Sequence, residues 1–131
     1  DEKYISISHS YHFSTVVISS VEVGIDIEKQ RSKIIKIAPK FIGFETFCLN
    51  EKDPAQVQKL IWVWCAKEAL YKALSPSHGL HWHDAEVINQ PNGKPEFLFR
   101  GEIADLIDGA KVHLSLSHDA GIASAMVVLE R

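Results

Sequence analysis

Two carboxylates on one short segment are the first residues of this chain whose type and spacing suggest chemistry. Asp26 and Glu28 stand two residues apart, so on a strand both side chains project from the same face. Val23, Ile25 and Ile27 are expected to form the opposite face, the one that joins the core. Two like charges this close require water or a bridging cation, and Mg²⁺ takes one or two carboxylates and leaves its other positions to water and phosphate. On the strand alone, a solvated polar face explains the pair more simply than a metal site.

A second group of charges interrupts an apolar helix. Almost every residue between 60 and 74 is apolar, which predicts a helix buried nearly all round, yet Lys67, Glu68 and Lys72 lie within it. Ionised groups in such a setting need partners. Glu68 and Lys72 stand four residues apart, so they could simply form an ion pair on an exposed face. Such a pair stabilises a helix by about 0.2–0.5 kcal/mol. Taken together with the strand carboxylates, this helix favours a site for a metal ion and a phosphate.

The strands that must position these groups are predicted by alternating apolar and polar residues or by runs of β-branched residues. An Asn-Gly pair at 92–93 adds a hairpin signal between two of them. The expected strands cover residues 4–9, 15–19, 21–28, 85–88, 96–99, 113–117 and 122–129.

Helix signals fill the space between these strands. A helical stretch from about residue 29 to 49 is interrupted at Pro39, and a short helix over 102–108 is closed by Gly109. Asp53 as N-cap and Pro54 at the first position start the longest helix, which runs to residue 74. The pattern predicts an α+β fold, in which an antiparallel sheet packs against this long helix.

The size and composition of the chain indicate one globular domain spanning residues 1–131. No apolar run approaches the roughly 18 residues that cross a bilayer, so no membrane span is expected. The N-terminus carries no secretion signal, and we expect a cytoplasmic location. Met126 is the only methionine, so residue 1 is not a native start and the chain is trimmed or a fragment. Cys48 and Cys65 are isolated, which predicts reduced thiols in or near the core.

Charge is distributed unevenly along the chain. The net charge of −3 argues against a dedicated nucleic-acid binder. Between Lys29 and Lys40, however, every charged residue is basic, which suits docking of an acidic partner as well as a plain solvated helix face.

One short repeat is visible in the sequence. Ser6-Ile7-Ser8-His9 matches Ser115-Leu116-Ser117-His118 at an offset of 109 residues, and an apolar strand follows each copy. Strand patterns converge easily, so this match alone is compatible with chance as well as with common ancestry.

The combination of a strand Asp-x-Glu and a helical Lys-Glu-Ala-x-x-Lys resembles a known family. Gly24-Ile25-Asp26-Ile27-Glu28 and Trp64-Cys65-Ala66-Lys67-Glu68-Ala69-Leu70-Tyr71-Lys72 are similar to the two signatures of the 4′-phosphopantetheinyl transferase superfamily. Ser6-Ile7-Ser8-His9-Ser10 resembles a motif of its larger, surfactin-synthetase-activator type. Asn92-Gly93-Lys94-Pro95 and Leu114-Ser115-Leu116-Ser117-His118 resemble the C-terminal part of its small holo-acyl-carrier-protein synthases.

This resemblance implies an activity and a set of roles. Members move phosphopantetheine from coenzyme A to a serine of an acyl or peptidyl carrier protein, use Mg²⁺, and release adenosine 3′,5′-bisphosphate. Asp26 and Glu68 would bind the metal, with Glu28 as the third and less secure ligand, and Lys72 would contact phosphate. Glu68 is also the first candidate for the base that deprotonates the carrier serine. Which carrier protein is served, that of fatty-acid, polyketide or peptide synthesis, is not readable from the sequence.

Further residues are implied in holding coenzyme A and the carrier protein. The basic run Lys29–Lys40 would dock an acidic carrier helix. Small members form homotrimers with shared sites, so His118 of a neighbouring chain would complete a trimeric site, whereas His9 would serve in a fragment of a monomer. The candidate ligands of coenzyme A are Ser8, His9, Lys67, Lys72, Ser117 and His118, with Lys3 and Lys94 as additions.

Three other interpretations compete with a transferase. A module of this fold could bind coenzyme A or a carrier protein without turnover, although retention of both carboxylate motifs argues against it. A generic Mg²⁺-dependent phosphohydrolase would not need the basic face. His78, His81, His83 and Asp84 could hold zinc, but no cysteine or second spaced pair completes the set, so a polar loop is the simpler interpretation.

Overall fold

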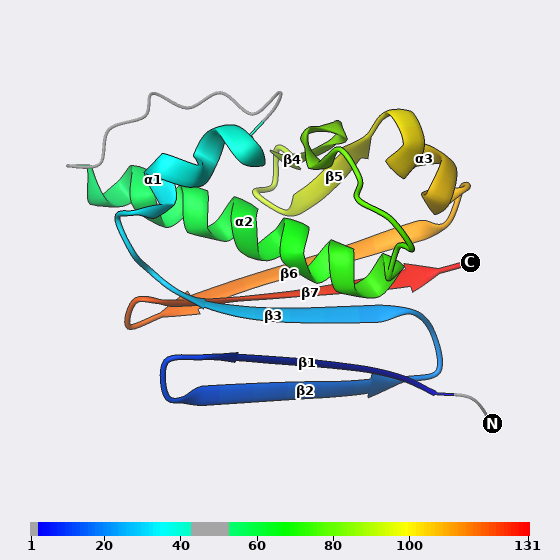
Figure 1. Cartoon of the computed structure of the whole chain (residues 1–131), viewed down its shortest axis with the longest axis horizontal. Coiled ribbons are helices and arrows are strands. Elements are labelled where there is room, and N and C mark those ends of the chain that lie inside the picture. Colours follow the sequence, from blue (N-terminus) through cyan, green and yellow to red (C-terminus); the bar gives the residue numbers. More distant parts are fainter. Residues whose placement is uncertain (1–2, 43–52) are drawn as a thin grey trace.

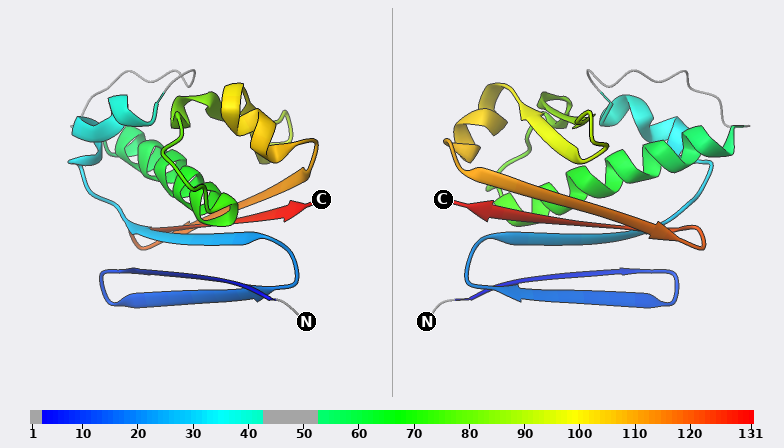
Figure 2. Two further views of the ribbon diagram at one scale, coloured as in Figure 1. Left: turned by 45° about the vertical axis from the view of Figure 1, so that its right-hand side comes forward. Right: turned by 180° about the vertical axis from the view of Figure 1, so that it is seen from behind.

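A computed structural model describes residues 3–42 and 53–131. Its main layer is an antiparallel sheet in the order β3-β7-β6, with the long helix α2 lying across one face and the β1–β2 hairpin beside β3 (Figures 1 and 2). The elements, with 3-10 turns written η, are β1 (Tyr4–Ser10), β2 (Phe13–Ser19), β3 (Val23–Lys29), α1 (Ile34–Ile37), η1 (Ala38–Lys40), α2 (Pro54–Leu74), η2 (Trp82–Asp84), β4 (Ala85–Asn89), β5 (Pro95–Phe99), α3 (Gly101–Ile107), β6 (Lys111–Asp119) and β7 (Ile122–Glu130).

The predicted strands and the α+β class are confirmed, with small changes at the ends. The stretch expected to be helical from residue 29 to 49 contains the short helix α1 and the 3-10 turn η1 around Pro39. The prediction is wrong for Lys29, which ends β3, and for residues 30–33 and 41–42, which form turns and loops. Residues 43–49, with Cys48, lie outside the described residues. In α3 the chain turns left-handed one residue earlier than expected, at Asp108, which precedes Gly109. No helix among the described residues has the length and apolar character needed to cross a membrane.

Helix α2 begins and ends where the sequence predicts. The side chain of Asp53 accepts a hydrogen bond from the backbone of Ala55 at 3.1 Å, Pro54 follows at the first position, and Ser75 ends the helix in the left-handed region with φ 43°. The helix packs against β3 and β7 on one side and against α1 and β4 elsewhere. Contacts on several sides explain why its apolar residues surround the axis instead of forming one stripe.

The face of β3 that packs against the long helix is not the one predicted from the sequence. Asp26 and Glu28 lie on the face that packs against α2, whereas Ile25 and Ile27 on the other face are only half-buried. The expectation that this second face forms the core is therefore wrong for both isoleucines. Gly24 is the physical reason, because a Cβ there would lie 1.9 Å from the carbonyl oxygen of Ala69. Without a side chain at Gly24, α2 sits close enough to cover the neighbouring carboxylates.

The β1–β2 hairpin reproduces the β6–β7 hairpin. Every backbone pair of β1–β2 has a counterpart at the same 109-residue offset, as in Ser8 with Thr15 and Ser117 with Ser124. Both hairpins turn with a left-handed residue at the same place, Tyr11 in one and Ala120 in the other. The short sequence repeat therefore belongs to a repeat of structure.

The two copies differ in what covers them. On β6–β7 the face that includes Leu114 and Val127 is buried beneath α2. The corresponding residues of β1–β2 are Ile5 and Ile18, which are 61% and 65% exposed. The opposite face of β1, which carries its serines, is the one that meets β3.

The close approach at Gly24 yields a stability prediction. Gly24→Ala should destabilise the protein by at least about 3 kcal/mol, because the new methyl group meets backbone atoms of Ala69 and Ala73, which cannot move independently of α2. Urea unfolding followed by circular dichroism measures the change. Gly79→Ala is the matched control, since nothing lies within 4 Å of its added Cβ, and it should shift stability by less than about 0.5 kcal/mol. Equal stability of the two variants would contradict the packing argument.

Candidate active site

Asp26 is the buried centre of the site. Asp26 is 4% exposed, and its Oδ1 accepts hydrogen bonds from Lys72 Nζ at 3.1 Å and from Ser8 Oγ at 3.3 Å. Its other oxygen, Oδ2, is also buried and accepts no hydrogen bond from the described residues. A buried oxygen without a donor is costly unless a ligand completes it. The solvated-face explanation of this carboxylate is therefore wrong.

Lys72 ties α2 to two strands. Besides Asp26, its ammonium donates to the carbonyl oxygen of Ile25 in β3 at 3.0 Å and to that of Ile7 in β1 at 3.3 Å. An ammonium has three hydrogens, and these three acceptors match them. In this structure Lys72 is a fixed positive charge at the site, and direct contact with a phosphate stays a prediction.

Glu28 and Glu68 bring further negative charge to Asp26. Burial, followed by the charge of Asp26, raises the pKa of Glu28 to about 7, although the indole Nε1 of Trp64 donates to its Oε1 at 3.2 Å. Burial and then the charge of Asp26 also raise the pKa of Glu68, while Lys72 opposes the shift. Glu28 and Glu68 therefore resist ionising beside Asp26, and a cation would relieve the repulsion.

Two residues of α2 that sequence reasoning did not assign to the site support it. Trp64 binds Glu28 as described, and the buried thiol of Cys65 donates to the backbone carbonyl of Asp26 at 3.3 Å. Burial strongly raises the pKa of this thiol, so it stays protonated as a donor. The four-residue spacing between Trp64 and Glu68 was the available signal, because it places both side chains on one helix face.

The donor set fits Mg²⁺. Asp26 offers a free buried oxygen, and Glu28 and Glu68 are half-buried carboxylates held at raised pKa. Among the described residues, no group of three or more His, Cys, Asp or Glu side chains is placed to hold a metal ion by itself, so the predicted set of three carboxylates is not preformed. Three protein ligands are not required, since Mg²⁺ takes one or two carboxylates together with water and phosphate.

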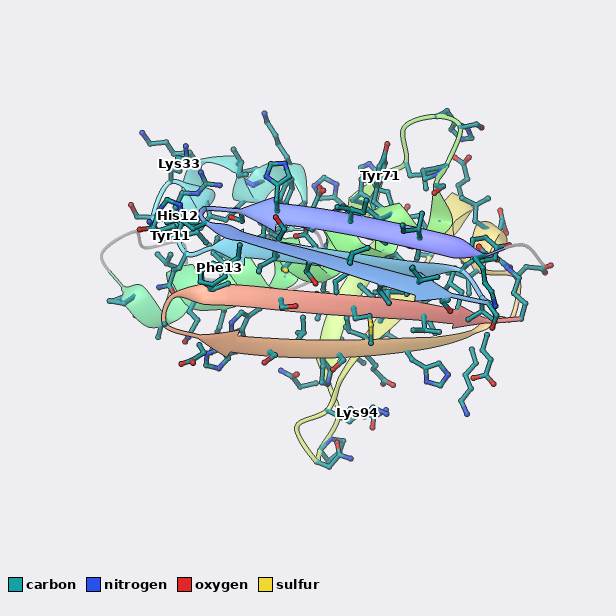
Figure 3. The ribbon with its side chains drawn as sticks, turned by 90° about the horizontal axis from the view of Figure 1, so that it is seen from below. Tyr11, His12, Phe13, Lys33, Tyr71 and Lys94 are labelled. Carbon is teal, nitrogen blue, oxygen red and sulfur yellow. The ribbon has the colours of Figure 1, made fainter. Side chains whose placement is uncertain are left out.

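The structure places the remaining predicted site residues in different parts of the molecule. Ser8 joins Asp26, but His9 follows on the exposed outer face of β1. Lys67 is buried and donates to the carbonyl oxygen of Phe41, so it does not join the carboxylates. Lys94 stands on the β4–β5 turn, well away from the β1–β2 tip at Tyr11 and His12 (Figure 3). Roles for His9, Lys67, Lys94 and the exposed Lys3 in binding coenzyme A stay predictions.

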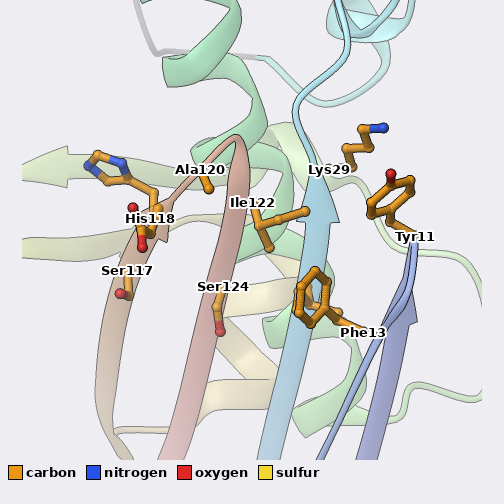
Figure 4. A pocket seen from close by; sticks show the side chains of 10 residues that line it. Tyr11, Phe13, Lys29, Ser117, His118, Ala120, Ile122 and Ser124 are labelled. Atoms are coloured by element: carbon orange, nitrogen blue, oxygen red, sulfur yellow. The ribbon is translucent and has the colours of Figure 1, made fainter.

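Ser117 and His118 line a separate groove beside the β6–β7 turn (Figure 4). The groove measures about 520 Å³ and runs between Tyr11 and Phe13 of the hairpin tip and the β6–β7 turn. Its β3 residues, Ile27 and Lys29, alternate with the carboxylates and so lie on the opposite face of the strand. His118 also contacts the side chains of Gln58 and Trp62 on α2. This chain's own Ser117 therefore does not meet Asp26.

The histidines after α2 contact each other and other groups of the protein. The rings of His81 and His83 stack at 4.5 Å, His83 Nε2 lies 2.7 Å from the carbonyl oxygen of Pro39, and His78 pairs with Glu102. These contacts favour the simpler interpretation of the histidines, that they belong to a polar loop.

A small pocket joins Glu28 to the basic segment. It measures about 150 Å³, and its lining includes Glu28, Trp64, Arg31 and Lys33. Positive charge therefore lies beside Glu28.

The model of the 4′-phosphopantetheinyl transferase superfamily matches residues 22–123. This chain belongs to that superfamily. It is 39% identical over 114 residues to the holo-[acyl-carrier-protein] synthase of Frankia alni, an alignment that covers 84% of this chain and 97% of the relative. β1 and β2 precede the segment matched by the family model.

Solved structures of holo-[acyl-carrier-protein] synthases have the same fold. The Neisseria meningitidis enzyme superposes with a TM-score of 0.70 at 24% identity, covering 84% of this chain and 98% of that one. The Helicobacter pylori enzyme, solved in complex with coenzyme A, superposes with a TM-score of 0.63 at 26% identity, covering 82% and 99%. The fold and the family predicted from the two motifs are confirmed.

The raised pKa of Glu28 predicts a pH-dependent stability. Because the folded pKa of about 7 lies above the ordinary 4.5, folding is penalised progressively as pH rises between these values. Glu28→Gln cannot ionise, so without Mg²⁺ it should be more stable than the parent at pH 8, by about 1–2 kcal/mol after allowing for solvent screening, and equal to it at pH 4. Urea unfolding at both pH values measures the difference.

The matched control for this experiment is Glu130→Gln. Glu130 is exposed and its pKa is lowered, first by its hydrogen bond with His113. Its replacement should bring no gain at pH 8. A Glu28→Gln variant with the parent's stability at both pH values would contradict the proposed burial of this charge.

Proposed function

We propose that this protein transfers the 4′-phosphopantetheine group of coenzyme A to a serine of an apo carrier protein. The observation that carries the proposal is the unsatisfied buried oxygen of Asp26, beside two carboxylates of raised pKa and the fixed charge of Lys72. Membership of the superfamily and the relatives described above support the same activity. Asp26 and Glu68 are the proposed Mg²⁺ ligands, with Glu28 as the third.

The residues of the site have separate tasks in this reaction. The carrier serine oxygen bonds to the β-phosphorus of the coenzyme A pyrophosphate, whose bond to the oxygen bridging the two phosphates breaks, and adenosine 3′,5′-bisphosphate leaves. When bound, Mg²⁺ supplies positive charge to the pyrophosphate oxygens. Lys72 adds a second positive charge that is already held in place, so little reorganisation is needed. Glu68, with its raised pKa, is the proposed acceptor of the serine proton.

The carrier protein is proposed to dock on the basic segment from Lys29 to Lys40. Its charged residues are all basic and all exposed, and α1 follows β3 directly, at the strand end that carries Glu28. The small pocket beside Arg31 and Lys33 offers the entering serine a path towards the carboxylates.

Assembly and location complete the proposal. A homotrimer would add His118 of a neighbouring chain to the site, and this assembly stays a prediction. Within the chain, β1 already reaches Asp26 through Ser8. A cytoplasmic location is likewise proposed from the sequence.

The activity is tested by mass spectrometry. Incubation with Mg²⁺ and coenzyme A should add one phosphopantetheine mass to an apo acyl carrier protein. Glu68→Gln should lower the rate at least about 100-fold, because it removes a metal ligand and the proton acceptor together. Asp105→Asn, at an exposed carboxylate on α3, is the control and should keep the parent's rate. A folded parent that binds coenzyme A without any mass shift would instead support a non-catalytic binding module.

The docking surface is tested by reversing its charge. The double variant Lys33→Glu and Lys36→Glu should raise KM for the carrier protein about tenfold or more and leave KM for coenzyme A unchanged, because carrier attraction depends on this charge. High salt should raise the parent's KM towards that of the variant. Lys111→Glu, an exposed change at the start of β6, is the control. An unchanged carrier KM would place the carrier elsewhere.

A further inference from the structure

Three serines attach the β1–β2 hairpin to the edge of β3. The hydroxyl oxygens of Ser6, Ser8 and Ser10 accept hydrogen bonds from the backbone N–H groups of Ile25, Ile27 and Lys29 at 3.0, 3.0 and 3.2 Å. The serines are two residues apart, so they share one face of β1. Side-chain hydroxyls thus satisfy the edge amides of β3, where a neighbouring strand would ordinarily offer backbone carbonyls.

Ser8 differs from the other two serines in where its own hydrogen goes. It donates to Oδ1 of Asp26 at 3.3 Å, and the residue is 6% exposed. A hydroxyl has a single hydrogen, and in this structure it is directed to the carboxylate of Asp26. The same Oδ1 accepts from Lys72, which leaves Oδ2 as the unbonded oxygen of the carboxylate.

We propose that Ser8 is a positioning residue, which fixes the carboxylate of Asp26 so that Oδ2 faces the cation. This inference rests on the proposed function and adds a role that the family resemblance did not assign to Ser8. It gives β1, which precedes the segment matched by the family model, a direct part in the site. Groups that orient metal ligands typically contribute 10–100-fold to metal affinity or activity, by order of magnitude.

Ser6 provides a matched comparison within the same strand. It is 6% exposed and accepts from β3 at the same 3.0 Å as Ser8, but it has no hydrogen bond with Asp26. Ser6→Ala and Ser8→Ala therefore remove the same attachment between strands. Only the second also removes a donor from the carboxylate.

The experiment measures Mn²⁺ binding by electron paramagnetic resonance, together with kcat and KM in the mass-shift assay. Mn²⁺ is a suitable probe because it prefers the same oxygen ligands as Mg²⁺. Both variants should lose similar stability in urea. Ser8→Ala alone should weaken Mn²⁺ binding and lower kcat by about tenfold or more while KM for coenzyme A stays unchanged. Ser8→Thr keeps the hydroxyl and should restore both the Mn²⁺ affinity and kcat. If Ser8→Ala does not fold, Ser8→Thr is measured in its place.

Two results would overturn the inference. Equal Mn²⁺ affinity of the Ser6→Ala and Ser8→Ala proteins would make Ser8 a structural residue only. A rise in KM for coenzyme A with unchanged Mn²⁺ affinity would make it a phosphate ligand instead. If the parent protein has no transferase activity but its Mn²⁺ binding still depends on Ser8, the positioning role is supported although the proposed function fails. The failure of one claim can therefore be told from the failure of the other.

Discussion

The ion pair between Lys72 and Asp26 is the interaction on which the rest of the structure depends. It joins the long helix to β3, and the same ammonium reaches β1 through the carbonyl oxygen of Ile7. An isolated carboxylate buried to this degree would be strongly destabilising, and the pair with its hydrogen bonds makes the burial tolerable. Removing either partner would leave an uncompensated charge between helix and sheet.

Close packing makes this arrangement geometrically available. Gly24 has no side chain, so the backbone of α2 at Ala69 and Ala73 meets β3 directly. Asp26, two residues further along the strand, is therefore covered by the helix instead of facing water. The unfavourable interaction in the site is repulsion between carboxylates. Glu28 and Glu68 are partly buried near Asp26, and their pKa values rise. A cation and a pyrophosphate are the complementary ligands for such a cluster with a lysine beside it.

The hairpin of β1 and β2 shows how one supersecondary unit serves two purposes in this chain. As β6–β7 it forms the sheet on which α2 packs, through residues such as Leu114 and Val127. As β1–β2 it presents the opposite face, and its serines satisfy β3 and reach Asp26. The register is the same in both copies, so the difference comes from the side chains and from what each copy packs against.

The sequence by itself determined the elements, the family and the identity of the central charges. Alternation located the strands, the Asp53-Pro54 cap placed the start of α2, and the spacing of Asp26, Glu28, Glu68 and Lys72 indicated the chemistry. These features are local, because they depend on the period of a strand or helix and on capping hydrogen bonds.

Only the tertiary structure decided which face of β3 is buried and which candidates meet. Ser8 joins Asp26, whereas Lys67 turns into the core and Ser117 lines a separate groove. Sequence spacing cannot reveal this, because period-two alternation defines two faces without saying which one a helix will cover. That choice was made by a contact between residues far apart in the chain, the fit of Gly24 against Ala69.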